Sequence, residues 1–244
     1  MFFKLNSFSL KIIYQDENFI AINKPSGIIV HPWSECADDT SLMYQVKEIT
    51  GKWIYPVHRL DRPVSGVILF AFSPESARHL KESLENNNTH KIYISLCMHE
   101  FKNPVCNTYE LFNQARTKKQ QAKTGIIPIE TSQNVTLSKV RIFTGRYHQI
   151  RRHFSSMGHH LVGDTKYGKG NINRYFREKY NLHRLFLHCV GLKITIFGND
   201  FEFKAELPKD LSSVVNQLKL SYNVDDLVFN SEFDNLVIFS KKLS

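Results

Sequence analysis

The sequence is organised around residues 57–72, which read VHRLDRPVSG followed by VILFAF. The second part is a continuous apolar run of strand length, which is typical of a strand buried in a core. Pro63 and Gly66 restrict the chain just before it, so we expect a rigid loop anchored to that strand. Asp61 lies in this loop between two arginines. A carboxylate held beside arginine stays ionised and can act as a nucleophile or general base, although the same arrangement also fits a structural ion pair.

Hydrophobic periodicity on both sides of this loop predicts a mixture of strands and helices. Residues 103–135 and the tail beyond Tyr222 show no clear pattern. Mostly antiparallel strands with a few helices indicate the α+β class. Strands are predicted over residues 11–14, 19–22, 67–72, 91–97, 136–143, 185–189 and 192–197. Helices are predicted from Thr40 or Ser41 to residue 50, from the cap Ser73 to residue 85, and over residues 148–157 and 211–220.

The composition is that of an ordinary globular protein, with 244 residues, 42% of them hydrophobic, 11 Gly and 8 Pro. It excludes collagen-like, disordered and disulfide-scaffold chains. No apolar run approaches the roughly 18 residues that a membrane-spanning helix needs. The N-terminus lacks the pattern of a signal peptide, so we expect a cytoplasmic protein. The 4 cysteines contain no C-x-x-C pair and are expected to be reduced thiols.

The positive charge is concentrated in one segment. Residues 139–184 contain 11 lysines and arginines against 2 acidic residues, which accounts for the whole net charge of +9. Most of these cations are arginines, interleaved with histidines and aromatic residues. Because arginine grips phosphate and stacks on bases, this mixture favours a nucleic-acid-binding surface. No stretch has the clean basic amphipathic face expected for binding to a membrane surface.

The same segment holds two histidine-containing motifs, TGRYHQIRRH at 144–153 and GHHLVGD at 158–164. His148 and His153 are five residues apart, which does not place two ligands on one helical face, and no H-E-x-x-H pattern occurs. We therefore expect no bound metal. No strand leads into a phosphate-binding glycine motif, so we expect no nucleotide cofactor.

These motifs together resemble the RluA-type pseudouridine synthase family. The resemblance covers roughly residues 11–207, in order and at plausible spacing. A further stretch, residues 173–185, is similar to the tRNA pseudouridine synthase C branch, which isomerises a uridine in the T-stem of tRNA, at position 65. Residues 100–135 depart from the pattern of that branch. The matching motifs are NKPSG at 23–27, HRLD at 58–61 with SG at 65–66, KIY at 91–93, GRYHQIR at 145–151, GHHLVGD at 158–164 and LH at 187–188.

The resemblance implies the architecture and the chemistry. It implies a bent, mainly antiparallel sheet flanked by helices, with RNA crossing a basic cleft. We expect one catalytic domain over residues 11–222, after an N-terminal extension (1–10) and before a C-terminal tail of unassigned role (223–244). The reaction is an isomerisation, so the resemblance implies no cofactor. We expect a monomer that acts on tRNA, with ribosomal RNA as the alternative substrate and a non-catalytic RNA-binding or chaperone protein as the alternative function.

The resemblance also assigns roles to individual residues. Asp61 matches the catalytic aspartate, which attacks either the ribose or the base, and Arg151 matches the arginine that pairs with it. A bidentate guanidinium fork is a suitable device for aiming that carboxylate. Tyr93 matches the tyrosine that stacks on the flipped uracil and acts in final proton removal, although it also fits a core aromatic residue. Leu187 is expected to line the pocket.

The remaining assignments concern RNA. Arg59 matches a residue that inserts into the RNA stack where the target base leaves, since base flipping requires a substitute. The histidines of the basic segment and His188 are expected to act as a hydrogen-bonding scaffold rather than as catalysts, and His58 to brace the loop. The predicted RNA-binding residues are Arg59, Arg62, Arg146, His148, Arg152, Lys166 and Arg174.

Overall fold

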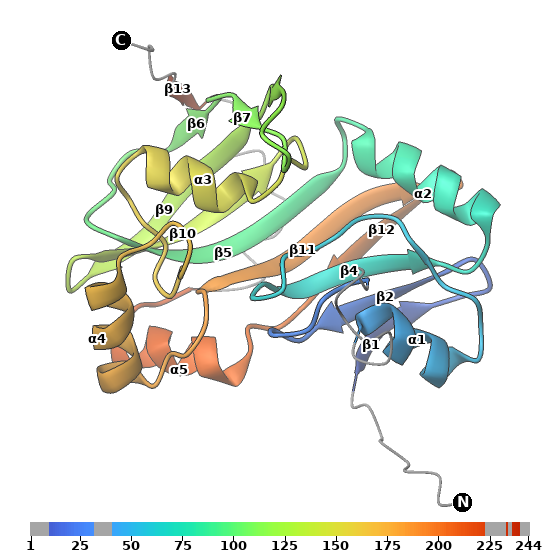
Figure 1. The fold of residues 1–244 in the computed structure, drawn as a ribbon, viewed down its shortest axis with the longest axis horizontal. Helices are drawn as coiled ribbons and strands as arrows, with labels where there is room; N and C mark the ends of the chain where they lie inside the picture. Colours follow the sequence, from blue (N-terminus) through green and yellow to red (C-terminus); the bar gives the residue numbers. More distant parts are fainter. Residues whose placement is uncertain (1–9, 32–40, 223–232, 234–235, 240–244) are drawn as a thin grey trace, which may run out of the picture.

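The computed structural model describes residues 10–31, 41–222, 233 and 236–239 (Figure 1). Its framework is an eleven-stranded sheet in the order β1-β2-β4-β11-β5-β10-β9-β6-β13, with β12 added beside β11 and β3 beside β4. Among the described strands, β4 with β11 and β6 with β13 are parallel neighbours, and the other pairs are antiparallel. A separate hairpin joins β7 to β8. The strands are β1 (Lys11–Gln15), β2 (Phe19–Lys24), β3 (Tyr55–Pro56), β4 (Ser65–Ala71), β5 (His90–Met98), β6 (Val105–Asn107), β7 (Leu111–Phe112), β8 (Lys119–Gln120), β9 (Thr124–Ser132), β10 (Val135–Ile142), β11 (Leu187–Ile196), β12 (Asn199–Lys204) and β13 (Val237–Phe239).

Five helices flank the sheet in the described part of the chain. Helix α2 packs against β4 and β11, α3 against β9, and α4 against α5 (Figure 1). The side chains of Ser41 and Ser73 cap α1 and α2 by accepting backbone N–H groups three residues ahead. No helix within the described ranges is long and apolar enough to cross a membrane. The helices are α1 (Leu42–Thr50), α2 (Pro74–Glu85), α3 (Gln149–Ser156), α4 (Gly170–Tyr180) and α5 (Lys209–Gln217).

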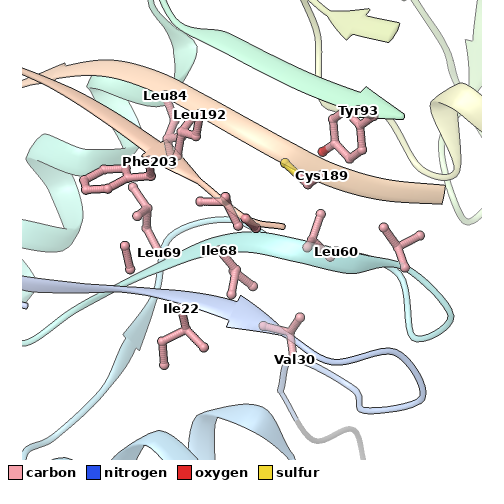
Figure 2. Packing of buried hydrophobic residues seen from close by; sticks show 14 of the residues in the cluster. Ile22, Val30, Leu60, Ile68, Leu69, Leu84, Tyr93, Cys189, Leu192 and Phe203 are labelled. Atoms are coloured by element: carbon pink, nitrogen blue, oxygen red, sulfur yellow. The ribbon is translucent and has the colours of Figure 1, made fainter. Parts of the chain in front are cut away.

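Two hydrophobic clusters form the core. One joins α1 and α2 to the strands around β4, and Figure 2 shows part of it, with Ile68 and Leu69 of β4 facing neighbours on β2, β11 and β12. The other lies under α4 and α5 and includes Phe176, Phe186 and Leu211. The run predicted as a buried strand forms most of β4, in which every residue is buried, whereas its last residue, Phe72, follows the strand and is half-buried.

The α+β class and most predicted elements are confirmed, with one error and several omissions. The two strands predicted over 185–189 and 192–197 form the single strand β11, and the prediction of a break is wrong. Gly191 follows a shift in register between β11 and β5, so the glycine marks a bulge within the strand and not its end. Helix α4 was not predicted, and residues 103–135 fold into β6 to β9. Of the two predicted caps of α1, Ser41 is the one observed, and Thr40 lies outside the described residues.

The start of β4 makes an unusually close approach to β11. Gly66 has φ +117°, and a Cβ there would overlap the backbone of its parallel neighbour Cys189. Cys189 in turn lies opposite Tyr93 on β5. Gly66, Cys189 and Tyr93 therefore form one row across three strands, which places the Asp61 loop and Tyr93 at the same end of the sheet.

Candidate active site

The loop that carries Asp61 is held in place by a side chain at the end of β2. The Lys24 side chain at the end of β2 is fully buried, and burial lowers its pKa to about 7. Its Nζ donates hydrogen bonds to the backbone oxygens of Pro25 at 2.8 Å, Arg62 at 3.3 Å and Val64 at 2.8 Å. These acceptors match the three donors of an ammonium group. Lys24 thereby fixes the chain on the C-terminal side of Asp61.

The loop after β2 adds a second set of contacts. Ser26 Oγ donates to the Pro63 oxygen at 2.8 Å, and the Gly27 N–H donates to the Arg62 oxygen at 2.8 Å. Arg62 Nε returns a hydrogen bond to the Gly27 oxygen at 2.9 Å. The NKPSG motif and the HRLD motif, far apart in the sequence, therefore form one braced unit.

Asp61 opens onto a cavity of about 290 Å³. Asp61 comes from the loop before β4, Tyr93 from β5, Leu187 from β11 and Arg151 from α3, so four distant segments converge on it. These are the residues to which the sequence assigned the chemistry and the pocket. The volume is close to the lower end of the usual range for small-ligand sites, roughly 300 Å³.

A wider hollow of about 640 Å³ continues from this cavity along the surface. Asp61 and Arg151 border both spaces, so the cavity and the hollow adjoin and together form one continuous groove. Such a shape suits an extended ligand from which one group is inserted. The groove is further lined by Ile29, Val30, His31, Arg59, Arg62, Thr165 and Lys166.

Arg151 is held between two carboxylates. Its Nε and Nη2 donate to Asp164 Oδ2 and Oδ1, both at 2.8 Å, whereas its Nη1 lies 3.3 Å from Asp61 Oδ2. The prediction that the bidentate fork points at Asp61 is therefore wrong, because the fork is taken by Asp164. The Asp164 side chain is 1% exposed and that of Asp61 is 17% exposed. The more deeply buried carboxylate thus takes the double hydrogen bond, as its greater loss of solvation requires.

The electrostatics follow from this pairing. Burial works against both charges, but each partner stabilises the other's ionised form. The Arg151 guanidinium lowers the pKa of Asp164, and Asp164 together with Asp61 raises the pKa of Arg151. Asp164 Oδ1 also accepts the backbone N–H groups of Lys166 and Tyr167 at 2.9 and 3.0 Å, which fixes the turn after it.

Tyr93 forms the opposite wall of the cavity. Figure 2 shows its ring on β5 with the hydroxyl turned toward Cys189. Burial, followed by the influence of Cys189, raises the pKa of Tyr93 well above its usual value of 10. The phenol therefore stays protonated at neutral pH and offers a neutral aromatic face. This favours the stacking role predicted for Tyr93 over a role as proton acceptor.

Most of the histidines are scaffold, as the sequence predicts. His58 Nε2 accepts the Leu69 N–H at 3.0 Å and braces the loop against β4. His153 bridges Thr124 and the Tyr109 oxygen, and His188 bridges Ser65 and the Ala205 oxygen. Burial lowers the pKa of His58 to about 3 and those of His153 and His188 to about 4.

The predicted RNA-binding residues are spread more widely than the catalytic ones. Arg59 and Lys166 are exposed beside the groove. Arg146 lines the cavity but donates to the Gln121 oxygen, and Arg152 donates to the Phe112 oxygen. Arg174 lies on the exposed face of α4 and borders neither space.

Sequence reasoning missed three residues of the site. Lys24 could have been recognised from the sequence, because a lysine at the end of an apolar strand and directly before Pro25 is unusual. Asp164 could also have been recognised, because it is one of only 2 acidic residues in the basic segment 139–184. Gln114, in the turn of the β7–β8 hairpin, lines both the cavity and the groove without any signal in the sequence. No cluster of three or more metal-ligating side chains occurs among the described residues.

Comparison with known proteins defines the class. Residues 18–156 match the family described as RNA pseudouridylate synthase. This match covers more than half of the chain, which therefore belongs to the RNA pseudouridylate synthase family. The protein is thus an RNA pseudouridine synthase, an isomerase that converts uridine to pseudouridine.

Individual relatives are similar over most of their length. The chain is 33% identical over 206 residues to the tRNA pseudouridine synthase C of Vibrio parahaemolyticus, which covers 75% of this chain and 84% of the relative. It is 35% identical over 208 residues to the enzyme of the same name from Haemophilus ducreyi, with 76% and 85% covered. The Haemophilus influenzae enzyme of that name is 31% identical over 232 residues, with 85% and 97% covered.

Solved structures support the fold. Human RNA Pseudouridylate Synthase Domain Containing 1 aligns with a TM-score of 0.68 at 20% identity, covering 87% of this chain and 96% of its own. Human RNA Pseudouridylate Synthase Domain Containing 4 aligns with a TM-score of 0.71 at 21% identity, covering 87% and 94%. The sheet and its helices are thus the family's catalytic fold.

Proposed function

We propose that this protein isomerises a uridine of tRNA, with Asp61 as the nucleophile. The observation that carries the proposal is the position of Asp61, which borders both the cavity and the adjoining groove and lies 3.3 Å from a buried arginine. The tRNA substrate is supported by the relatives described above, which are named tRNA pseudouridine synthase C and match over three quarters of the chain or more. The T-stem uridine at position 65 is the proposed target.

The cavity suits a uridine turned out of its stack. Asp61 forms a bond to the ribose or to the base, the bond between C1′ and N1 breaks, and the uracil turns within the cavity. A bond then forms between C1′ and C5, the bond to Asp61 breaks and restores the carboxylate, C5 loses its proton and N1 gains one. Arg151 orients the Asp61 carboxylate, and Tyr93 and Leu187 confine the ring as it turns.

The groove is the proposed RNA track. Arg59 and Lys166 border it, and positive side chains in a groove bind the phosphate backbone. Arg59 is exposed beside Asp61 and has the reach to fill the gap that the flipped base leaves. Arg62, Arg146, Arg152 and Arg174 complete the proposed RNA-binding set, whereas His148 lines the cavity as well as the groove.

Tritium release tests the proposal directly. Transcripts of tRNA labelled with tritium at C5 of uridine lose the label only when C5 becomes bonded to C1′. Wild type is expected to release tritium and the Asp61→Asn variant to release none, while both bind the RNA within a few-fold of each other. Loss of RNA binding by Asp61→Asn would mark Asp61 as structural. Release from ribosomal RNA fragments but not from tRNA would reassign the substrate.

We further propose that the chain acts as a monomer in the cytoplasm. Asp61, Tyr93, Arg151 and Leu187 are brought together by the fold of a single chain, so the proposed chemistry needs no residue from a second copy. The proposed catalytic unit is residues 11–222, with residues 1–10 before it and 223–244 after it. The second flank contributes β13, which pairs with β6 at the edge of the sheet.

A further inference from the structure

His148 has an unusual backbone conformation at the edge of the cavity. It precedes α3 with φ 52° and ψ 33°, in the left-handed region that residues with a side chain rarely adopt. Strain of this kind persists where the surrounding structure enforces it and is concentrated at functional sites. The ring is stacked on Tyr147, with centroids 3.7 Å apart, and lines both the cavity and the groove.

Two side chains approach the same oxygen of Asp61. His148 Nε2 lies 3.6 Å from Asp61 Oδ2, and Arg151 Nη1 lies 3.3 Å from that same atom. Among the described residues, no hydrogen bond or ion pair reaches Oδ1. The 3.6 Å separation exceeds a hydrogen bond, but contacts of this kind in a free enzyme commonly shorten when substrate binds.

Tyr167 determines which ring nitrogen of His148 carries the proton. Its hydroxyl lies 3.0 Å from His148 Nδ1, and burial raises the pKa of Tyr167, which keeps the hydroxyl protonated. A carboxylate only accepts hydrogen bonds, so a lone pair on Nε2 facing Asp61 Oδ2 would be repelled. The favourable arrangement has Tyr167 donating to Nδ1 and the Nε2–H pointing at Asp61.

The ring is neutral at physiological pH. Burial lowers the pKa of His148 to about 4, with Arg151 and Lys166 acting in the same direction and the carboxylates of Asp61 and Asp164 acting against it. A neutral donor orients the Asp61 carboxylate without adding a second cation beside Oδ2, which Arg151 already pairs.

We propose that His148 is a positioning residue, whose neutral ring, oriented by Tyr167, holds Asp61 Oδ2 together with Arg151 and leaves Oδ1 as the attacking oxygen. This inference rests on the proposed nucleophilic role of Asp61. It gives His148 a function distinct from the RNA contact that the sequence predicts.

Two variants of His148 separate the roles. His148→Phe keeps an aromatic ring to stack on Tyr147 but has no donor, whereas His148→Gln places an amide N–H near the position of Nε2. Under single-turnover conditions with saturating enzyme, we expect His148→Phe to slow tritium release by about 10- to 100-fold, as expected when a reacting group is misplaced. His148→Gln should recover most of that loss, and both variants should bind tRNA with nearly wild-type affinity.

A third variant and a pH profile complete the test. Tyr167→Phe removes the group that sets the tautomer and should slow the reaction without weakening tRNA binding. The rates of wild type and His148→Gln should share one pH profile, because a neutral ring does not titrate near pH 6.5, the usual pKa of histidine, whereas Lys24, with a pKa of about 7, titrates in both. Thermal unfolding of each variant verifies that it is folded.

The outcomes are distinct. A His148→Phe enzyme as fast as wild type, a loss confined to tRNA affinity, or a His148→Gln variant as slow as His148→Phe would each overturn the positioning role. A rate that falls as pH rises through about 6.5 in wild type but not in His148→Gln would also overturn it, since a protonated His148 ring would then be required. If wild type released no tritium from any RNA, the proposed function itself would fail first.

Discussion

Replacement of Asp164 by Asn tests whether the buried pair supports the site. The amide keeps the shape of the carboxylate but can accept only one of the two guanidinium hydrogen bonds now made at 2.8 Å. A hydrogen bond to a charged group contributes about 1.5–3 kcal/mol to stability. In addition, the NH₂ group of the asparagine is a donor that faces the donor groups of Arg151, which is unfavourable. We therefore expect the free energy of unfolding to fall by about 2–4 kcal/mol, less than the roughly 3–5 kcal/mol for complete removal of a buried partner, because one hydrogen bond remains.

Thermal unfolding is the assay. For a chain of this size, that loss corresponds to a Tm lowered by about 5–15 °C. Because the folded-state pKa of Asp164 is lowered, its contribution is fully present above the unfolded-state pKa and disappears as pH falls through the folded-state pKa. The difference between wild type and variant should therefore be constant near neutral pH and shrink toward strongly acidic pH.

Asp210→Asn is the matched control. Asp210 also pairs with an arginine, Arg184, but its side chain is 45% exposed. Solvent screening limits such a pair to about 1 kcal/mol or less. An Asp164→Asn variant no less stable than Asp210→Asn would refute the reasoning, as would a difference from wild type that grows on acidification.

Two further predictions concern activity and RNA binding. Arg151→Lys should lower the single-turnover rate by about 100-fold or more, because an ammonium group cannot reach Asp164 and Asp61 together; a near-normal rate would remove Arg151 from the mechanism. The affinity for tRNA should fall steeply as the salt concentration is raised. Lys166→Met should reduce the slope of log Kd against log salt by about 1, as expected for one lost phosphate contact. A slope that Lys166→Met leaves unchanged would exclude Lys166 from the RNA track.

The sequence predicted the local features of this protein better than its long-range pairings. The apolar run after Asp61 identified β4, and serine caps identified α1 and α2, because these signals are contained within a few residues. Ordered motifs also assigned Asp61, Tyr93, Arg151 and Leu187 to one site, and the structure brings them to one cavity. Their catalytic roles stay predictions that the variants above address.

The errors arise where tertiary geometry decides between local alternatives. Arg151 has two carboxylates within reach, and the choice of Asp164 for the fork depends on burial that no spacing encodes. The break predicted between residues 189 and 192 is instead a bulge beside Gly191, since β11 stays paired with β5 on both sides of it. The strands between residues 103 and 135 are short or contain proline and glycine, so they lack the alternation that identifies a strand.

The row formed by Gly66, Cys189 and Tyr93 fixes how far apart the backbone segments on two sides of the cavity lie when residues of the core are substituted. The Asp61 loop and the Tyr93 strand are separated by two strand spacings, about 10 Å in all, a distance fixed by backbone geometry. Leu60, Cys189 and Tyr93 succeed one another along that span in Figure 2. Substitutions in the surrounding core change how firmly the sheet holds together, but the separation of the two backbone segments that carry Asp61 and Tyr93 is set by the hydrogen-bonded strands between them. The core can therefore vary in side-chain volume while that separation stays constant.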